Sequence, residues 1–276
     1  MPDLHTRLEG KVAIVTGASG TGSGDFWGIG EAIAIMFARQ GAKVLLVSRD
    51  QKNAEGALSK IKEEGGEASF FAGDVTDIGS CQRMVAAAVE GYGKLDVVVN
   101  NVGTMNPSPT SVTDVDEKFW DTIMEVNLKS VMLTSKYAIP EMIKAGGGSI
   151  INISSVGGVQ AGWRPSHPYS ASKAGMMGLS KSMAVHYGRD NIRVNCIVVG
   201  QVHSPKVDGI ISDEMRNMRR RSAPLGTEGT GWDVAWASVF LASDEARWIS
   251  GVTLPVDAGL LAATPLAMFP YLKDEK

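Results

Sequence analysis

The clearest indication of the fold lies in Lys11-Val-Ala-Ile-Val-Thr-Gly-Ala-Ser-Gly20, where a short apolar run passes directly into glycine-rich sequence. Gly28-Ile-Gly30 then precedes a helical pattern from Glu31 to Gln40. The apolar side of that pattern carries Ala32, Ile33, Ile35, Met36 and Phe37. We therefore expect a buried strand, a glycine-rich loop and a helix, which together form the first part of a βαβ unit.

The same alternation continues along most of the chain. Further apolar runs that predict strands occupy residues 41–47, 68–72, 95–99, 149–153 and 192–198, with helical stretches between them. Near-continuous Val, Ile and Leu strands joined by helices indicate a parallel sheet covered on both faces, because parallel strands need crossover connections. We expect one doubly wound α/β domain of the Rossmann type over residues 1–276, since no repeat or linker divides the chain.

The composition favours small-molecule chemistry. A net charge of −3 and a pI of about 5.9 give no broad electrostatic reason to bind nucleic acid or an anionic membrane. Cys81 and Cys196 are far apart in the sequence, so we expect two reduced thiols and no metal site. The amino terminus lacks a signal-peptide pattern and no run could span a bilayer, so we expect a cytoplasmic protein.

The glycine-rich loop predicts a dinucleotide site. Glycines between a strand and a helix let the backbone approach a pyrophosphate, and the helix dipole favours its charge. A merely flexible surface loop is the alternative, and the βαβ context argues against it. The expected phosphate-binding residues are Gly17, Ser19, Gly28, Ile29 and Gly30.

The end of the second predicted strand should select between the two nicotinamide cofactors. A carboxylate there accepts ribose hydroxyls, whereas a basic side chain accepts a 2′-phosphate. Ser48 and Arg49 occupy this place, which favours NADP, although the neighbouring Asp50 keeps NAD open.

Four motifs follow in order: Asn100-Asn-Val-Gly103, Asn127, Ser154-Ser155 and Tyr169-Ser-Ala-Ser-Lys173. Together they resemble the short-chain dehydrogenase/reductase family, and the resemblance extends from Lys11 to about Gly259. It implies an NAD(P)-dependent oxidoreductase acting on a secondary alcohol or ketone. The resemblance implies further cofactor contacts. Asp74 and Val75 lie on the adenine side, Lys173 holds the nicotinamide ribose, and Gly200 and Ser204 lie on the nicotinamide side. The remaining expected cofactor-binding residues are Asn101, Gly103, Tyr169 and Val202.

The pair Tyr169 and Lys173 makes chemical sense as an acid/base centre. A phenol with an ordinary pKa of ~10 is too weakly acidic to work alone at neutral pH. A lysine four residues later on a helix lies on the same face and supplies a cation. The resemblance implies that Tyr169 exchanges a proton with the substrate oxygen, that Ser155 hydrogen-bonds this oxygen, and that Asn127 holds a water for proton relay. Ser154 remains an alternative to Ser155.

Two departures from the family pattern stand out. Relative to the family pattern, residues 21–27 are an insertion in the glycine-rich loop. The insertion is either a lid over the pyrophosphate, with Phe26 and Trp27 as its anchor, or a tolerated surface loop. The other is Val199, where the family often has proline. Enoyl reductases of the family, which also have a long first loop, place their lysine seven positions after the tyrosine, where this chain has Met176. We therefore favour carbonyl and alcohol chemistry over double-bond reduction.

The resemblance implies that residues 203–223 cover the substrate. An apolar series at helical spacing, together with three side chains near the expected site, favours an apolar or aromatic substrate, although a plain packing face is an equal alternative for the series. The series is Val207, Ile210, Ile211, Met215 and Met218, and the three side chains are Gln160, Trp163 and His203. The interleaved Arg216, Arg219, Arg220 and Arg221 could meet a phosphorylated acyl carrier, or form a solvated face or subunit contact.

Several functional alternatives remain beside the alcohol/ketone oxidoreductase. A reductase of 3-oxoacyl thioesters is one, and a catalytically silent cofactor-binding regulatory protein is another, although no residue of the Ser155, Tyr169 and Lys173 set is lost. A sugar-nucleotide epimerase would need a larger carboxyl-terminal region. The resemblance also implies a homotetramer or dimer, in which the tail at residues 260–276 could pack across an interface through Met268, Phe269 and Tyr271.

Overall fold

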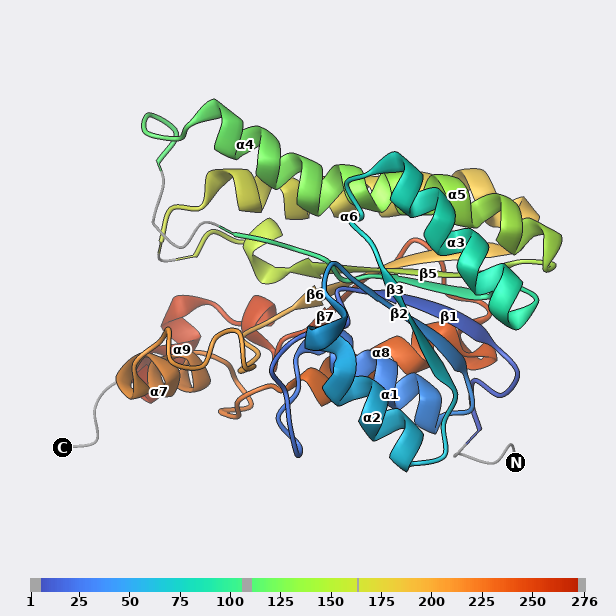
Figure 1. Ribbon diagram of the computed structural model, residues 1–276. Coiled ribbons are helices and arrows are strands. Elements are labelled where there is room, and N and C mark those ends of the chain that lie inside the picture. The colour runs from blue at the N-terminus through green and yellow to red at the C-terminus, as the bar shows by residue number, and fades with distance from the viewer. Residues whose placement is uncertain (1–5, 106–110, 163, 273–276) are drawn as a thin grey trace.

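A computed structural model describes residues 6–105, 111–162 and 164–272 of the chain. Its middle layer is a seven-stranded sheet in which every pairing is parallel, with strand order β3-β2-β1-β4-β5-β6-β7 (Figure 1). The strands are β1 Val12–Thr16, β2 Lys43–Ser48, β3 Ala68–Ala72, β4 Val97–Asn100, β5 Gly148–Ser155, β6 Ile192–Val199 and β7 Thr253–Val256. The prediction of a doubly wound, Rossmann-type α/β fold is confirmed.

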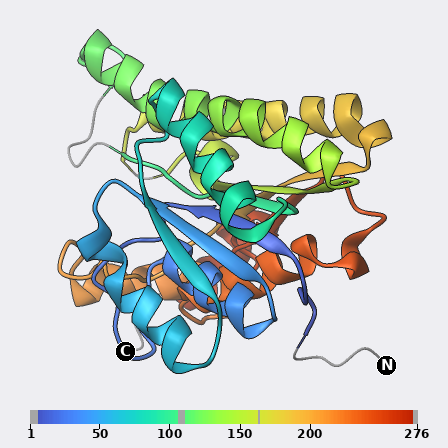
Figure 2. The ribbon, with the colours of Figure 1, turned by 45° about the vertical axis from the view of Figure 1, so that its right-hand side comes forward.

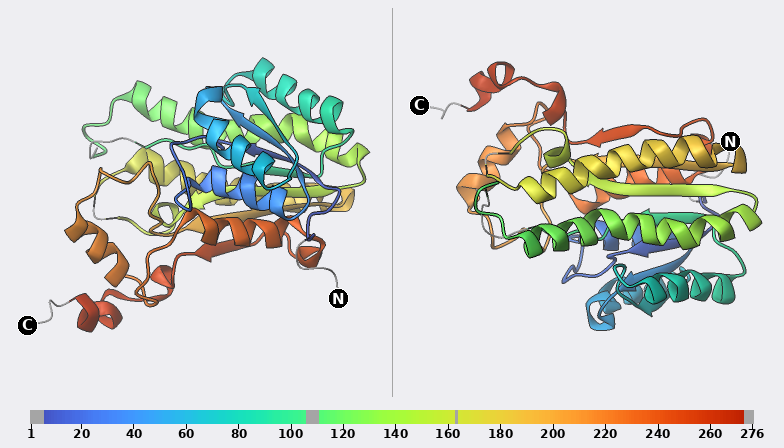
Figure 3. Two further views of the ribbon diagram at one scale, coloured as in Figure 1. Left: turned by 60° about the horizontal axis from the view of Figure 1, so that its bottom comes forward. Right: turned by 90° about the horizontal axis from the view of Figure 1, so that it is seen from above.

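Helices cover both faces of the sheet, as Figures 1 and 2 show. Because side chains alternate along a strand, Ala13 and Val15 of β1 join the core on one face, whereas Ile14 joins the core on the other. The first face is covered by α1 Ile29–Arg39, α2 Glu55–Glu63 and α8 Gly231–Ala242. The second is covered by α3 Ile78–Tyr92, α5 Ser130–Lys144 and α6 His167–Tyr187, which lie side by side in the right-hand view of Figure 3.

The strand order places the functional region. β1 pairs with β2 on one side and with β4 on the other, so the order reverses at β1. Val15 lies opposite Val99 of β4, and Val99 lies opposite Ile151 of β5. The carboxyl ends of these three strands therefore meet at one edge, which is where doubly wound sheets bind ligands.

The segment after β6 differs from its prediction. Residues 205–210 form turns, and α7 spans only Asp213–Arg221, begun by Ser212, whose hydroxyl accepts the amide of Met215 at 3.2 Å. Ile210 is 77% exposed. The interpretation of Val207 to Met218 as one continuous helical pattern was therefore wrong. Gly209, with φ +74°, and the cap at Ser212 interrupt the helix.

Two further elements were not foreseen. Strand β7 was missed because it is short and contains Pro255, which is tolerated at the sheet edge. The tail forms α9 Pro265–Leu272 beside α7, where the Arg221 guanidinium donates to the Tyr271 carbonyl at 2.6 Å, and residues 273–276 lie outside the described part. Within the described ranges, no helix is long and apolar enough to cross a membrane.

Candidate active site

The first loop is locked against the end of β4. Thr16 donates its hydroxyl to the Val99 carbonyl and accepts the Asn101 amide, both at 3.1 Å. The Asn101 side chain in turn donates to the carbonyls of Thr16 and Gly17 at 3.2 and 3.1 Å. Gly17 has φ +68°, a conformation that favours glycine. Asn101 thus holds the turn that leads to α1, a positioning task on the loop.

The start of α1 can receive a phosphate. A Cβ on Gly30 would lie 2.3 Å from the Gly17 carbonyl oxygen, so only glycine lets the helix approach the loop this closely. The amides of Ile29 and Gly30 have no hydrogen-bond partner among the described residues. Unpaired amides at a helix amino terminus are donors for an anion. These residues fit the pyrophosphate of a dinucleotide.

Glu31, in the first turn of α1, contacts the loop in a way that the sequence did not reveal. Its side chain is 1% exposed, and its carboxylate accepts the Gly28 amide at 2.9 Å. Burial raises the pKa of the Glu31 carboxyl, while hydrogen bonds from the amides of Gly28 and Gly22 act in the opposite direction. Because Gly22 belongs to the insertion, Glu31 ties the insertion to the start of α1.

The residues expected near the adenosine lie at or just after the carboxyl ends of β2 and β3. Ser48 donates its hydroxyl to the Asp50 carbonyl at 2.9 Å, so it is used in the turn after β2, and Arg49 is exposed. The Asp74 carboxylate accepts hydrogen bonds from the backbone amide and the hydroxyl of Thr76, at 2.9 and 2.8 Å. The hydrogen bond from the backbone amide is the main cause of the lowered pKa of Asp74. The charge of Arg49 also lowers the Asp74 pKa.

At the end of β5 the two serines have different partners. Ser154 is buried and donates to the Lys173 carbonyl at 2.9 Å, which fixes α6 to the strand. Ser155 is hydrogen-bonded to the Tyr169 phenol and also accepts the Gly157 amide at 3.2 Å. Burial raises the pKa of Tyr169, and the bond with Ser155 acts in the opposite direction. The phenol is therefore protonated at neutral pH and able to donate a proton.

Lys173 lies beneath the phenol. Its ammonium donates to the Ile153 carbonyl at 2.8 Å and lies 5.9 Å from the centroid of the Tyr169 ring. Burial lowers the pKa of Lys173 to about 8; the Cys196 thiol opposes this shift and the charge of Lys206 adds to it. A Cβ on Gly103 would lie 3.3 Å from the Lys173 ammonium nitrogen, so Gly103 leaves the lysine room.

Asn127 lies where the helix changes its winding. Between α4 Glu117–Met124 and α5, residues Glu125–Lys129 form a π-helical turn (η2), a feature that is frequent at functional sites. The side-chain oxygen of Asn127 accepts a hydrogen bond from the Thr104 backbone amide at 2.8 Å. Its side-chain nitrogen donates to the Thr104 carbonyl at 2.9 Å and to the Ser172 hydroxyl at 3.1 Å. Its side chain therefore fastens the Gly103–Thr104 backbone beside Lys173.

The turn after β6 closes the other side of the site. A Cβ on Gly200 would lie 2.5 Å from the Asp257 Cα, so glycine is required there. Val202 and Ser204 are buried, and the Ser204 carbonyl accepts the amides of Val207 and Asp208. From the same segment, Lys206 donates to the Gly103 carbonyl at 3.2 Å. No sequence pattern indicated Lys206, because only the fold brings it close to Gly103.

Comparison with known proteins agrees with this architecture. A family model described as enoyl-(acyl carrier protein) reductase matches residues 22–261. A solved structure from Burkholderia xenovorans, described as a short-chain dehydrogenase/reductase, superposes with a TM-score of 0.88 at 40% identity, covering 94% of this chain and 99% of that one. The chain belongs to the short-chain dehydrogenase/reductase family. It is accordingly an oxidoreductase that acts on CH–OH groups.

Relatives within this short-chain dehydrogenase/reductase family have different substrates. A 2,5-dichloro-2,5-cyclohexadiene-1,4-diol dehydrogenase of Sphingobium indicum is 38% identical, over 93% of this chain and 98% of the relative. A (+)-borneol dehydrogenase of Salvia officinalis is 37% identical, over 93% and 91%. A 3-oxoacyl-[acyl-carrier-protein] reductase of Thermotoga maritima is 34% identical, over 92% and 99%.

The residues expected on the substrate side of this dehydrogenase/reductase have the following surroundings in the structure. Gln160 is exposed, and Trp163 lies outside the described residues. His203 is buried and paired with Asp208 at 3.1 Å. Each arginine of the cluster has a partner within the chain: Arg216 binds Glu228, Arg219 the Val202 carbonyl, Arg220 Asn217, and Arg221 the Tyr271 carbonyl. Met176 is fully buried among apolar side chains.

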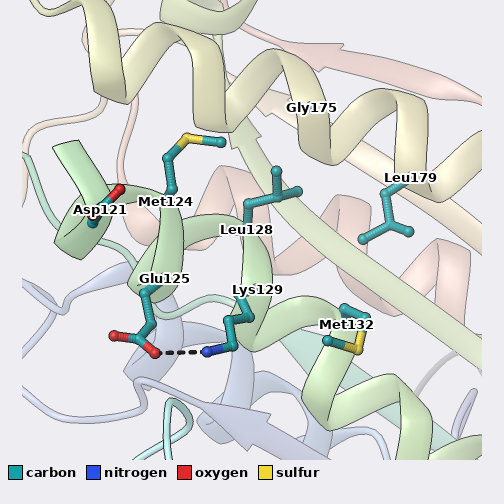
Figure 4. Close-up of a pocket in the computed structure, with 8 residues that line it drawn as sticks. All are labelled: Asp121, Met124, Glu125, Leu128, Lys129, Met132, Gly175 and Leu179. Atoms are coloured by element: carbon teal, nitrogen blue, oxygen red, sulfur yellow. Dashed lines mark hydrogen bonds and ion pairs between the residues drawn. The ribbon is translucent and has the colours of Figure 1, made fainter.

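A groove on the surface does not coincide with this site. It lies between α4, η2, α5 and α6, and is lined mainly by apolar side chains such as Met124, Leu128 and Leu179 (Figure 4). The Glu125–Lys129 ion pair, at 2.8 Å, crosses one end of it. Neither Asn127 nor Tyr169 lines the groove, although both belong to the same helical segments. It is therefore distinct from the candidate active site.

Proposed function

We propose that the protein catalyses reversible, NADP-dependent interconversion of a secondary alcohol and a ketone. The observation that carries the proposal is the close grouping of the Ser155 hydroxyl, the Tyr169 phenol and the Lys173 ammonium at the carboxyl end of β5. These groups lie at the edge of the sheet that also carries the glycine-rich loop. A proton donor beside a nucleotide loop is what carbonyl reduction requires.

In this proposal Tyr169 transfers the proton. Its raised pKa keeps the phenol protonated at neutral pH, so in reduction it donates a proton to the carbonyl oxygen as charge develops there. Ser155 donates a hydrogen bond to the same oxygen and stabilises that charge. The positive charge of Lys173 stabilises the phenolate that remains after the proton is transferred. Asn127 keeps the Gly103–Thr104 backbone beside Lys173.

The cofactor-binding residues act along the edge of the sheet. We propose that the pyrophosphate binds at Gly17, Ser19, Gly28, Ile29 and Gly30, the adenosine at Ser48, Arg49, Asp74 and Val75, and the nicotinamide half at Asn101, Gly103, Tyr169, Lys173, Gly200, Val202 and Ser204. The nicotinamide supplies or accepts the hydride when it is bound. The preference for NADP rests on Arg49 directly after β2, whose exposed guanidinium would pair with a 2′-phosphate.

For the substrate, we propose an apolar alcohol or ketone whose oxygen is carried on a ring. Two of the relatives described above are named for hydroxyl groups on carbocycles. The second candidate is a 3-oxoacyl thioester, favoured by the bacterial reductase among the relatives. The arginine cluster supports this second candidate poorly, because each of its guanidinium groups already has a partner in the chain.

The experiment is a substrate panel assayed with NADPH and with NADH. Cyclic ketones and a 3-oxoacyl thioester are compared by kcat/KM. The proposal predicts higher kcat/KM for a cyclic ketone with NADPH. Turnover of the thioester alone would favour the second candidate, and binding of a dinucleotide without any turnover would favour a silent regulatory protein. The homo-oligomer stays a prediction, which gel filtration tests.

A further inference from the structure

The insertion in the first loop is a folded hairpin. In this inserted hairpin, residues 21–27, Ser23 and Phe26 exchange two backbone hydrogen bonds, each of 3.0 Å. Trp27 at its end is 4% exposed, packs in the core of the α1 face, and donates its indole N–H to the Gly24 carbonyl at 2.7 Å. The hairpin is therefore anchored from below by Trp27.

The tip of the hairpin is attached to two segments far along the chain. The Trp232 indole, in the first turn of α8, donates to the Asp25 carbonyl at 2.9 Å. The Phe26 ring stacks on the His203 ring, with centroids 5.2 Å apart and planes 27° apart. These two contacts to segments far along the chain are not expected of a loop that is merely tolerated on the surface. Phe26 instead joins the nucleotide loop to the turn that follows β6.

His203 is the point where three segments meet. It is 6% exposed, its Nε2 lies 3.1 Å from Asp208, and its Nδ1 lies 3.9 Å from Glu228. Its amide donates to the Gly229 carbonyl at 2.8 Å. Glu228 also binds Arg216 of α7 through both carboxylate oxygens. Phe26 stacks on His203, and His203 already links residues 203–208 to residues 228–229, which precede α8.

We propose that Phe26 is a positioning residue, which through His203 holds the turn at residues 200–204 in place for the nicotinamide half of the cofactor. The inference rests on the proposed function for the identity of the ligand. It assigns the inserted hairpin to the nicotinamide side of the site, and not to a lid over the pyrophosphate. Loss of the ring should therefore loosen residues 200–208 and weaken binding of the whole dinucleotide, but not of its adenosine half.

The test compares Phe26→Ala with Phe26→Tyr and with the matched hairpin control Ser23→Ala. Dissociation constants are measured for NADPH and for adenosine 2′,5′-bisphosphate, and hydrogen exchange is measured for residues 200–208 in the protein without cofactor. An aromatic pair of this kind predicts NADPH binding weaker by roughly 3- to 10-fold in Phe26→Ala. We expect unchanged bisphosphate binding, faster exchange at 200–208, recovery in Phe26→Tyr and no effect in Ser23→Ala.

Other outcomes separate the possible errors. Equal weakening of NADPH and the bisphosphate would overturn the assignment in favour of a phosphate lid, and no change in binding or exchange would reduce the hairpin to a surface loop. A wild type that binds neither NADPH nor NADH would refute the proposed function instead. The exchange experiment would then still decide whether Phe26 orders residues 200–208. If the wild type prefers NADH, the probes are NADH and AMP.

Discussion

The ammonium of Lys206, at 3.2 Å from the Gly103 carbonyl, acts electrostatically on the buried ammonium of Lys173. Burial is the main cause that lowers the pKa of Lys173 to about 8, and the positive charge of Lys206 lowers it further. Lys206 is held there by its hydrogen bond to the Gly103 carbonyl. The protonation of Lys173 therefore depends on a residue of the covering segment.

Replacing Lys206 should move the pH dependence of the reaction. In Lys206→Met the repulsion disappears, so the pKa of Lys173 rises and its positive charge persists to higher pH. The alkaline limb of the kcat/KM profile, which reports the free enzyme, should shift upward. Lys181→Met, an exposed position farther along α6, is the control and should leave the profile unchanged. A downward shift in Lys206→Met would contradict the electrostatic coupling.

The two serines at the end of β5 should separate cleanly. Ser155→Ala removes the hydrogen bond that stabilises the developing oxyanion and should lower kcat by about 10²- to 10³-fold. Ser154→Ala should instead lower the free energy of unfolding by about 1 kcal/mol, because its hydroxyl bonds the Lys173 carbonyl, with little effect on kcat. Steady-state kinetics and denaturant titration of both variants measure this. The reverse pattern would assign the catalytic role to Ser154.

Two glycines in helices should respond oppositely to alanine. Gly30→Ala would place a Cβ 2.3 Å from the Gly17 carbonyl, so the free energy of unfolding should fall by ~1–3 kcal/mol. Gly178 lies in α6 with nothing near its Cβ position, and Gly178→Ala should raise the free energy of unfolding by ~0.5–1 kcal/mol. Urea titration tests both. Equal effects would refute the close packing of α1 on the loop.

Cofactor selection should depend on Arg49. Without its guanidinium the 2′-phosphate loses charge-assisted hydrogen bonds, so Arg49→Ala should lower the ratio of kcat/KM for NADPH over NADH by roughly 10- to 100-fold. The neighbouring exposed cation Lys52 provides the control, and Lys52→Ala should change the ratio far less. An unchanged ratio in Arg49→Ala would show that the arginine only covers the surface.

The sequence was sufficient for elements with a strong local pattern. The buried strands were predicted because they are apolar along their length, and the doubly wound sheet followed from their alternation with helices. The edge strand β7 escaped because it is short, partly exposed and contains Pro255. The helical interpretation of residues 205–210 was wrong because apolar residues recur there at helical spacing. The backbone nevertheless forms turns, one of them at Gly209.

The site was predictable where spacing within one element carried the information. Tyr169 and Lys173 lie on one helix, and their spacing of four residues was enough to predict that they share a face of it. Phe26 and His203, or Lys206 and Gly103, are separated by more than a hundred residues and meet only through the fold. No local pattern could have indicated those contacts. The bond between Ser155 and Tyr169 also needed the structure, because the two serines are neighbours in sequence.

The central claim is that the Tyr169 phenol transfers the proton. Its most direct test is single-turnover reduction of a cyclic ketone by Tyr169→Phe with NADPH, together with the dissociation constant for NADPH. We predict a rate lower by about 10²- to 10⁴-fold, the usual contribution of a general acid, with NADPH binding nearly unchanged because the ring remains. A mutant that reduces the ketone at close to the wild-type rate would contradict the account.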